Sequence, residues 1–131
     1  MKSLTVLYDS ECGFCVRCRA WLERQKAFVP LKFLPRNSLE AKLQFPNLDF
    51  GDELIAITED GGVYRGTQAW IMCLYALEEY RALSLRLAHP SMLPLARHIY
   101  KTVSRNRKSL SQWLGLRSEE ELNRMISQLT I

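Results

Sequence analysis

The sequence predicts an α/β domain in which strands and helices follow the order β-α-β-α-β-β-α, with a helical extension after them. Two observations predict this class. Short apolar runs alternate with segments whose apolar residues recur at helical spacing, and Gly, Pro or Asp residues separate them. The chain has 131 residues, of which 47% are hydrophobic, and this is enough for one compact core. We expect a single domain overall, with a core over residues 1–83 and a basic helical extension over residues 84–131 packed on it.

A pair of cysteines stands where the first predicted strand gives way to the first predicted helix. Residues 4–8 are a nearly continuous apolar run, which is typical of a strand covered on both faces. From residue 13 to about residue 26, apolar side chains recur at helical spacing with charged residues between them. Cys12 and Cys15 form a C-G-F-C motif at the start of this helix. Such a pair closes a small disulfide ring with little backbone movement, and the unpaired N–H groups of a helix N-terminus favour a thiolate.

The remaining core elements complete the order. Residues 29–34 alternate and predict the second strand, and Ser38 is the expected N-cap of a short helix after it. Residues 54–58 and 63–65 are predicted to form a hairpin, because Asp-Gly-Gly lies between them. Helical spacing predicts the last core helix over residues 67–77. This order is the thioredoxin/glutaredoxin arrangement, and it places the cysteine pair at the carboxyl end of a parallel strand.

Beyond the core the pattern is wholly helical. Leu95, Ile99 and Val103 share one face of a helix. Ser118 and Glu121 form a capping box that predicts a last helix near the end of the chain. The sequence therefore predicts that this extension adds helices to the core and no further strand.

The charge of the chain is concentrated in this extension. The net charge is +4, and residues 84–118 hold seven basic residues and no acidic one. Basic residues scattered on amphipathic helices are usually a solvated face, so we expect no nucleic-acid partner, whereas contact with an anionic membrane surface stays open. The longest apolar run, residues 70–77, is too short to span a bilayer, and the start of the chain is too short and polar for a signal peptide. We expect a cytoplasmic protein without a transmembrane segment.

The cysteines of an intracellular chain are kept reduced, so structural disulfides are not expected. Cys18 extends the motif to C-x-x-C-x-x-C, which invites a metal or cluster interpretation. On a helix these positions drift along one face, and a tetrahedral zinc site needs a fourth ligand that no second paired motif supplies. We predict no metal and no other cofactor, and a packed core position for Cys18. A zinc- or cluster-binding protein stays an alternative.

Three blocks of the sequence go beyond a lone C-x-x-C motif. They are Tyr8-Asp9-x-x-Cys12-x-x-Cys15, then Gly62-Val63-Tyr64-Arg65-Gly66 with Ala69, and finally Leu93-Pro94, Tyr100 and Arg105-Asn106-Arg107. Together they resemble the DCC family of predicted thiol-disulfide oxidoreductases, named for its Asp-Cys-Cys motif, over about residues 3–116. The resemblance implies a thioredoxin-like fold and a redox activity. A redox-inert binding module with the same fold is the competing interpretation.

The predicted active-site residues are Cys12, Cys15 and Asp9. We expect Cys12 to be the nucleophile, because it lies at the more exposed side of the helix start, and Cys15, one turn deeper, to resolve the mixed disulfide. Asp9 has two candidate roles. It either exchanges a proton with Cys15, or accepts N–H bonds from the loop or serves as N-cap of the helix.

The predicted substrate is a disulfide-bearing protein or a small thiol such as glutathione. Tyr8 and Phe14 flank the cysteine motif and are candidate substrate contacts. Thr67 is the expected cap of the helix after the hairpin. Together with Gly66 it lies where glutaredoxin-like proteins hold the carboxylate of glutathione on helix N–H groups, although an ordinary helix cap explains both residues as well.

Overall fold

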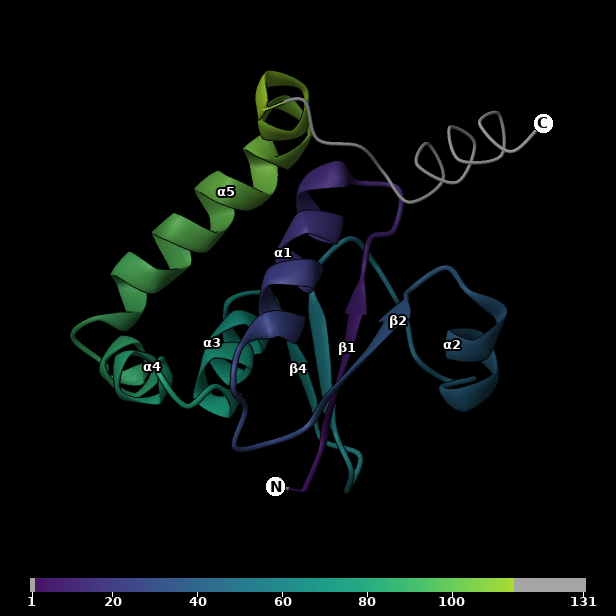
Figure 1. Cartoon of the computed structure of the whole chain (residues 1–131), viewed down its shortest axis with the longest axis horizontal. Coiled ribbons are helices and arrows are strands. Elements are labelled where there is room, and N and C mark those ends of the chain that lie inside the picture. The colour runs from purple at the N-terminus through teal and green to yellow at the C-terminus, as the bar shows by residue number, and fades with distance from the viewer. Residues whose placement is uncertain (1, 115–131) are drawn as a thin grey trace.

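Four strands form one mixed sheet, and helices cover both of its faces (Figure 1). The computed structural model describes residues 2–114, except for the side chains of residue 108 and residues 110–114. The strands are β1 (Leu4–Tyr8), β2 (Leu31–Pro35), β3 (Ile55–Thr58) and β4 (Val63–Arg65). The helices are α1 (Gly13–Arg24), α2 (Leu39–Gln44), α3 (Thr67–Ala76), α4 (Arg81–Ala88) and α5 (Leu93–Leu114). The predicted α/β class and element order are confirmed.

The sheet has the order β2-β1-β3-β4, with β1 parallel to β2 and antiparallel to β3, which in turn is antiparallel to β4. Side chains alternate along the central strand β1. Leu4 and Val6 belong to a core cluster with α3, whereas Leu7 belongs to a second cluster with Ala41 of α2. The continuous apolar run of β1 is thus explained by helices on both sides, and the topology is that of a thioredoxin-like fold.

The two helices after the core pack against α1 and α3. Leu87 of α4 and Ala96 of α5 form a third buried cluster with Leu74 and Leu77. Figure 1 shows α5 rising from α4 along α1 towards the start of α1, so a segment far along the sequence reaches the cysteine motif. The predicted division between residues 83 and 84 falls inside α4. The predicted last helix lies outside the described residues, and none of the helices described is both long and apolar enough to cross a membrane.

Two predicted helix caps have different outcomes. Ser38 is the N-cap of α2, and its Oγ accepts a hydrogen bond from Ala41 N at 3.1 Å, as predicted. The prediction that Thr67 caps α3 is wrong, because Thr67 is the first helical residue and Gly66 is the N-cap. Gly66 has a φ of 61°, which favours glycine, and its N–H donates to Leu54 O at 2.9 Å. This turn brings β4 directly into the helix and leaves no position for a side-chain cap.

Candidate active site

The cysteine motif lies at the junction of β1 and α1. Cys12 is the N-cap of α1, and Cys15 lies one turn into the helix. Cys12 N donates to Asp9 O at 3.3 Å, and Cys12 O accepts from Val16 N at 3.0 Å. The chain therefore makes a tight turn from the strand into the helix. This turn places the Cys12 side chain at the positive end of the helix dipole, where a thiolate is stabilised.

The exposure of the two thiols is the reverse of the prediction. Cys12 is only 3% exposed, whereas Cys15 is half-buried and lines a pocket. The expectation that Cys12 is the more accessible thiol is wrong, because Cys12 is buried at the junction of β1 and α1. Cys15, one turn later, faces the space between α1 and α5. The sequence could not show this, since it depends on the path of the turn and of a distant helix.

The two thiols differ in their affinity for a proton. The pKa of Cys15 is raised above its ordinary range, first by a hydrogen bond with Cys12, then by burial and by the negative charge of Cys12. Asp9 raises it further, and the cation of Arg107 lowers it. Hydrogen bonding raises a thiol pKa when the protonated form is the donor. The raised pKa of Cys15 therefore favours its protonated form, which is the form that can donate a hydrogen bond to Cys12.

The other two cysteines line the same pocket but have different surroundings. Cys18 is exposed, so the prediction of a packed core position for it is wrong, whereas Cys73 is buried. The pocket still removes part of the Cys18 thiol from water, and this desolvation, followed by the charge of Cys12, raises its pKa to about 11. Burial alone raises the pKa of Cys73 to about 12. Both side chains are therefore neutral thiols near neutral pH. Among the residues described, no three His, Cys, Asp or Glu side chains are grouped so that they could hold a metal ion.

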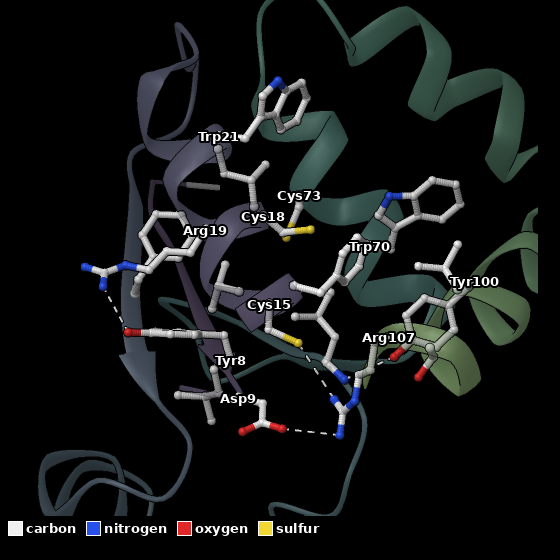
Figure 2. A pocket seen from close by; sticks show the side chains of 18 of the residues that line it. Tyr8, Asp9, Cys15, Cys18, Arg19, Trp21, Trp70, Cys73, Tyr100 and Arg107 are labelled. Carbon is white, nitrogen blue, oxygen red and sulfur yellow. Dashed lines mark hydrogen bonds and ion pairs between the residues drawn. The ribbon is translucent and has the colours of Figure 1, made fainter. Parts of the chain in front are cut away.

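A cluster of two cations and one carboxylate adjoins the cysteine pair. Asp9 Oδ2 lies 3.4 Å from Arg36 Nη2 and 3.3 Å from Arg107 Nη2. Arg107 Nη1 also donates to Cys15 Sγ at 3.9 Å, so one guanidinium joins the carboxylate to the pocket-facing thiol (Figure 2). The side chains of all three charged residues are between 14% and 18% exposed. Since the trio has one positive charge in excess, it favours a thiolate nearby.

Of the two structural contacts predicted for Asp9, the structure has the bond to the loop and not the N-cap of α1. Asp9 Oδ1 accepts a hydrogen bond from Glu11 N at 3.0 Å, which is the predicted contact with the loop. The alternative that Asp9 is the N-cap of α1 is wrong, because Cys12 holds that position. Asp9 is thus tied to the turn through one oxygen and to Arg36 and Arg107 through the other.

Two residues of this site, Arg36 and Arg107, were given no role from the sequence. A signal for Arg36 was present, because the parallel register pairs Tyr8 with Pro35 and so brings the next residues, Asp9 and Arg36, to the same edge. Arg107 lies 92 residues beyond Cys15. Its place in the third sequence block was the only indication, and its position depends on how α5 crosses the core.

A pocket of about 260 Å³ runs from Cys15 into the space between α1, α3 and α5. Arg107, Asp9 and Tyr8 lie at the cysteine end, whereas Trp21, Cys73 and Trp70 lie farther along it (Figure 2). Its apolar lining also includes Phe14, Leu22, Leu54, Leu74, Ile99 and Val103. The pocket is therefore polar near Cys15 and mainly apolar farther along.

The structure brings some of the predicted substrate contacts together and leaves others apart. Tyr8 and Phe14 both line the pocket, and Tyr8 Oη accepts a hydrogen bond from Arg19 Nη1 at 2.9 Å. Gly66 and Thr67 are not part of the pocket lining in the described part of the chain. The N–H of Gly66 is already bonded to the backbone of β3. The carboxylate site expected at these two residues remains a prediction.

The sheet order and the cysteine pair at the end of β1 place the protein in the thioredoxin-like class. Over residues 6–113 the chain matches the family described as DCC1-like thiol-disulfide oxidoreductase, and it belongs to that family. The resemblance found in the sequence is confirmed. No curated protein and no solved structure matches the chain.

Proposed function

We propose that this protein catalyses thiol–disulfide exchange with Cys12 and Cys15 as its redox dithiol and Cys12 as the nucleophile. The observation that carries the proposal is the placement of both cysteines at the N-terminus of α1, with Cys12 as its N-cap and Cys15 one turn later. The helix dipole there supports a thiolate on Cys12, the nucleophilic form of cysteine, and the raised pKa of Cys15 supports a stored proton on that thiol. We place the reaction in the cytoplasm, where a reductant regenerates the dithiol.

The first step is attack of the Cys12 thiolate on one sulfur of a substrate R–S–S–R′. The S–S bond of the substrate breaks, R′–S⁻ leaves and takes up a proton, and a mixed disulfide of Cys12 with R–S remains. Cys12 is 3% exposed, so this attack requires a local opening around the start of α1. The substrate for this step is a disulfide in a protein or in a small molecule.

The second step is resolution by Cys15. The hydrogen bond with Cys12 and the charge of Cys12 both raise the pKa of Cys15, and both are lost once Cys12 is bonded to the substrate. The pKa of Cys15 then falls, with Arg107 beside it to stabilise the thiolate. Cys15 loses its proton and attacks Cys12 Sγ, the Cys12–Cys15 disulfide forms, and R–S⁻ leaves and is protonated. The substrate has gained two electrons from the dithiol and two protons, one of which Cys15 releases while the other comes from solvent, because Cys12 starts as a thiolate.

For Asp9, we propose that it positions Arg107. Its contacts with Arg36, Arg107 and the loop N–H support this role, because they occupy both of its oxygens. Transfer of the Cys15 proton to Asp9 is the competing role. The two differ in whether the pH dependence of resolution changes when the carboxyl group is removed.

Trapping of the mixed disulfide tests the proposal. In a Cys15→Ser variant the second step is blocked, and we expect an adduct on Cys12 that mass spectrometry identifies after exposure to disulfide substrates in cells. A Cys12→Ser variant is the matched control and should trap no adduct. Adducts that form only on Cys15, in the Cys12→Ser variant, would reverse the two roles. If neither variant forms an adduct, and replacing both cysteines leaves the cellular function intact, the binding-module interpretation replaces the enzyme.

A further inference from the structure

The pocket beside Cys15 is built for an apolar group. Trp21 and Leu22 of α1, Trp70 and Leu74 of α3, and Ile99 with Val103 of α5 line it. Near the cysteine end, Asp9 is paired with Arg107 and Arg36 (Figure 2). The fourth charged residue of the lining, Arg19, donates to Tyr8 Oη, so each of these four charged groups already has a partner. A ligand that fills this space transfers apolar surface out of water along three helices and needs polar atoms only near Cys15.

The backbone next to the pocket is not free to pair with an extended peptide. Leu54 lies just before β3 and lines the pocket. Its N–H donates to Tyr100 Oη at 3.1 Å, and its C=O accepts from Gly66 N at 2.9 Å. Recognition by strand addition requires free backbone donors and acceptors at an edge. Because α5 supplies Tyr100 to this position, the backbone contact that an extended polypeptide would make here is already occupied.

The volume of the pocket limits the size of its occupant. It is about 260 Å³, slightly below the roughly 300–1,000 Å³ typical of sites for drug-sized ligands. A short alkyl or aryl arm matches this volume, whereas the charged tripeptide glutathione would have to bring its charges into the apolar part. Ile99 and Val103 are 39% and 36% exposed, so the space between α1 and α5 opens to solvent and gives a ligand an entry.

We infer that the disulfide substrate of this protein is a small molecule with an apolar arm, which occupies the pocket between α1, α3 and α5. This inference rests on the proposed function and names its substrate class. The S–S bond of the ligand lies at the cysteine end, beside Cys15 and the Arg107 guanidinium. Cys12 is buried next to Cys15 and is not part of the pocket lining, so its attack on the bound disulfide uses the local opening described above, and resolution by Cys15 follows. The cation there also stabilises the thiolate that leaves in each step.

A series of symmetrical dialkyl disulfides, from dimethyl to dibutyl, tests the inference with the full-length wild-type protein. For each disulfide, the second-order rate constant for oxidation of the reduced protein is divided by the rate constant for oxidation of dithiothreitol by the same disulfide. This ratio removes the differences in intrinsic reactivity between the disulfides. Burial of each methylene group should raise this ratio about fourfold, and three should raise it roughly 60-fold. Bis(2-hydroxyethyl) disulfide is the polar isostere of dipropyl disulfide and should react at least tenfold more slowly on the same scale.

Variants of α5 show whether the pocket is the origin of this preference. Val103→Gln adds a polar group to the lining, and we expect it to lower the ratio for dibutyl disulfide about tenfold and that for dimethyl disulfide less than twofold. Leu95→Gln, on the same helix at a 48% exposed position outside the pocket lining, is the matched control and should change neither. Ile99→Gln is a second lining variant, used if Val103→Gln lowers the helix content measured by circular dichroism.

The outcomes separate this inference from the proposed function. A ratio that does not change with chain length, or equal effects of Val103→Gln and Leu95→Gln, would overturn the apolar substrate while leaving thiol–disulfide exchange in place. A denatured protein disulfide or glutathione disulfide that exceeds dibutyl disulfide on the normalised scale would also overturn it. Absence of reaction with every disulfide, together with absence of a trapped adduct on Cys12, would instead overturn the proposed function.

Discussion

Two ends of one pocket hold thiols that the structure treats differently. Cys15 has the sulfur of Cys12, a guanidinium and a carboxylate around it, whereas Cys73 belongs to an apolar core cluster. Burial raises the pKa at both ends. For Cys15, hydrogen-bonding and charged partners add to the effect of burial, whereas burial alone acts on Cys73. The comparison teaches that charged and hydrogen-bonded neighbours distinguish a candidate redox cysteine from one that burial alone keeps as an inert thiol.

The largest expected effect comes from replacing cysteines of the dithiol and, separately, the other cysteines of the pocket, and comparing the rates of disulfide reduction. Cys12→Ser removes the proposed nucleophile, so the rate of disulfide reduction should fall at least about 1,000-fold. Cys18→Ala and Cys73→Ala remove thiols of the same pocket without touching the dithiol. They should lower the rate less than twofold, when each is measured with the same small disulfide and dithiothreitol as reductant. A loss of activity in either alanine variant that equals the loss in Cys12→Ser would contradict the separation of the two ends.

The next effect concerns the cation at the cysteine end. Arg107 lowers the pKa of Cys15, so Arg107→Gln should raise that pKa and slow the resolution of the mixed disulfide about tenfold at neutral pH. Resolution is measured by rapid mixing of the protein carrying a preformed adduct on Cys12. Arg105→Gln is the matched control, because it removes one positive charge from an exposed residue of the same helix. If both variants slow resolution equally, the effect comes from net charge and not from the contact with Cys15.

The elements of the fold could be predicted from sequence because each depends on local periodicity. The apolar run of β1 and the Ser38 cap of α2 are decided within a few residues. The environments of Cys12 and Cys18 could not be predicted in this way. Cys12 is buried and Cys18 is exposed, and both environments depend on how the surrounding segments pack in three dimensions. Arg107 reaches the site only because α5 runs beside α1 towards the start of that helix, a tertiary arrangement that no local pattern encodes.

A smaller expected effect concerns the contribution of Asp9 to the rate of resolution by Cys15. Asp9→Asn keeps the size of the side chain and its bond from Glu11 N, but it removes the charge that pairs with Arg107. We expect resolution to slow about threefold with an unchanged pH profile, because Arg107 is positioned less firmly. The profile is measured from pH 6 to 9 on the preformed adduct. Loss of the pH dependence in this variant would assign the proton transfer to Asp9 instead.

The smallest expected effect is a change in the alkylation rate of Cys18 when Cys12 is oxidised. Burial and the charge of Cys12 raise the pKa of Cys18 to about 11, so Cys18 should react slowly with iodoacetamide at pH 8 despite its exposure. Oxidation to the Cys12–Cys15 disulfide removes that charge, and the pKa of Cys18 should then fall. We expect alkylation of Cys18 to be about twofold faster in the oxidised protein, measured by mass spectrometry of the peptide that contains it.

The control for this measurement is the Cys12→Ser variant, which has no charge at that position and should show the faster rate even under reducing conditions. Equal rates for Cys18 in the reduced and oxidised wild-type protein would mean that Cys12 is a neutral thiol when reduced. The polar end would then lack the thiolate on which the proposed exchange depends, and Cys15 would be the better candidate for the attacking sulfur. A difference of the expected sign supports the thiolate without using any substrate, since it reads the charge of Cys12 from a thiol one turn beyond Cys15.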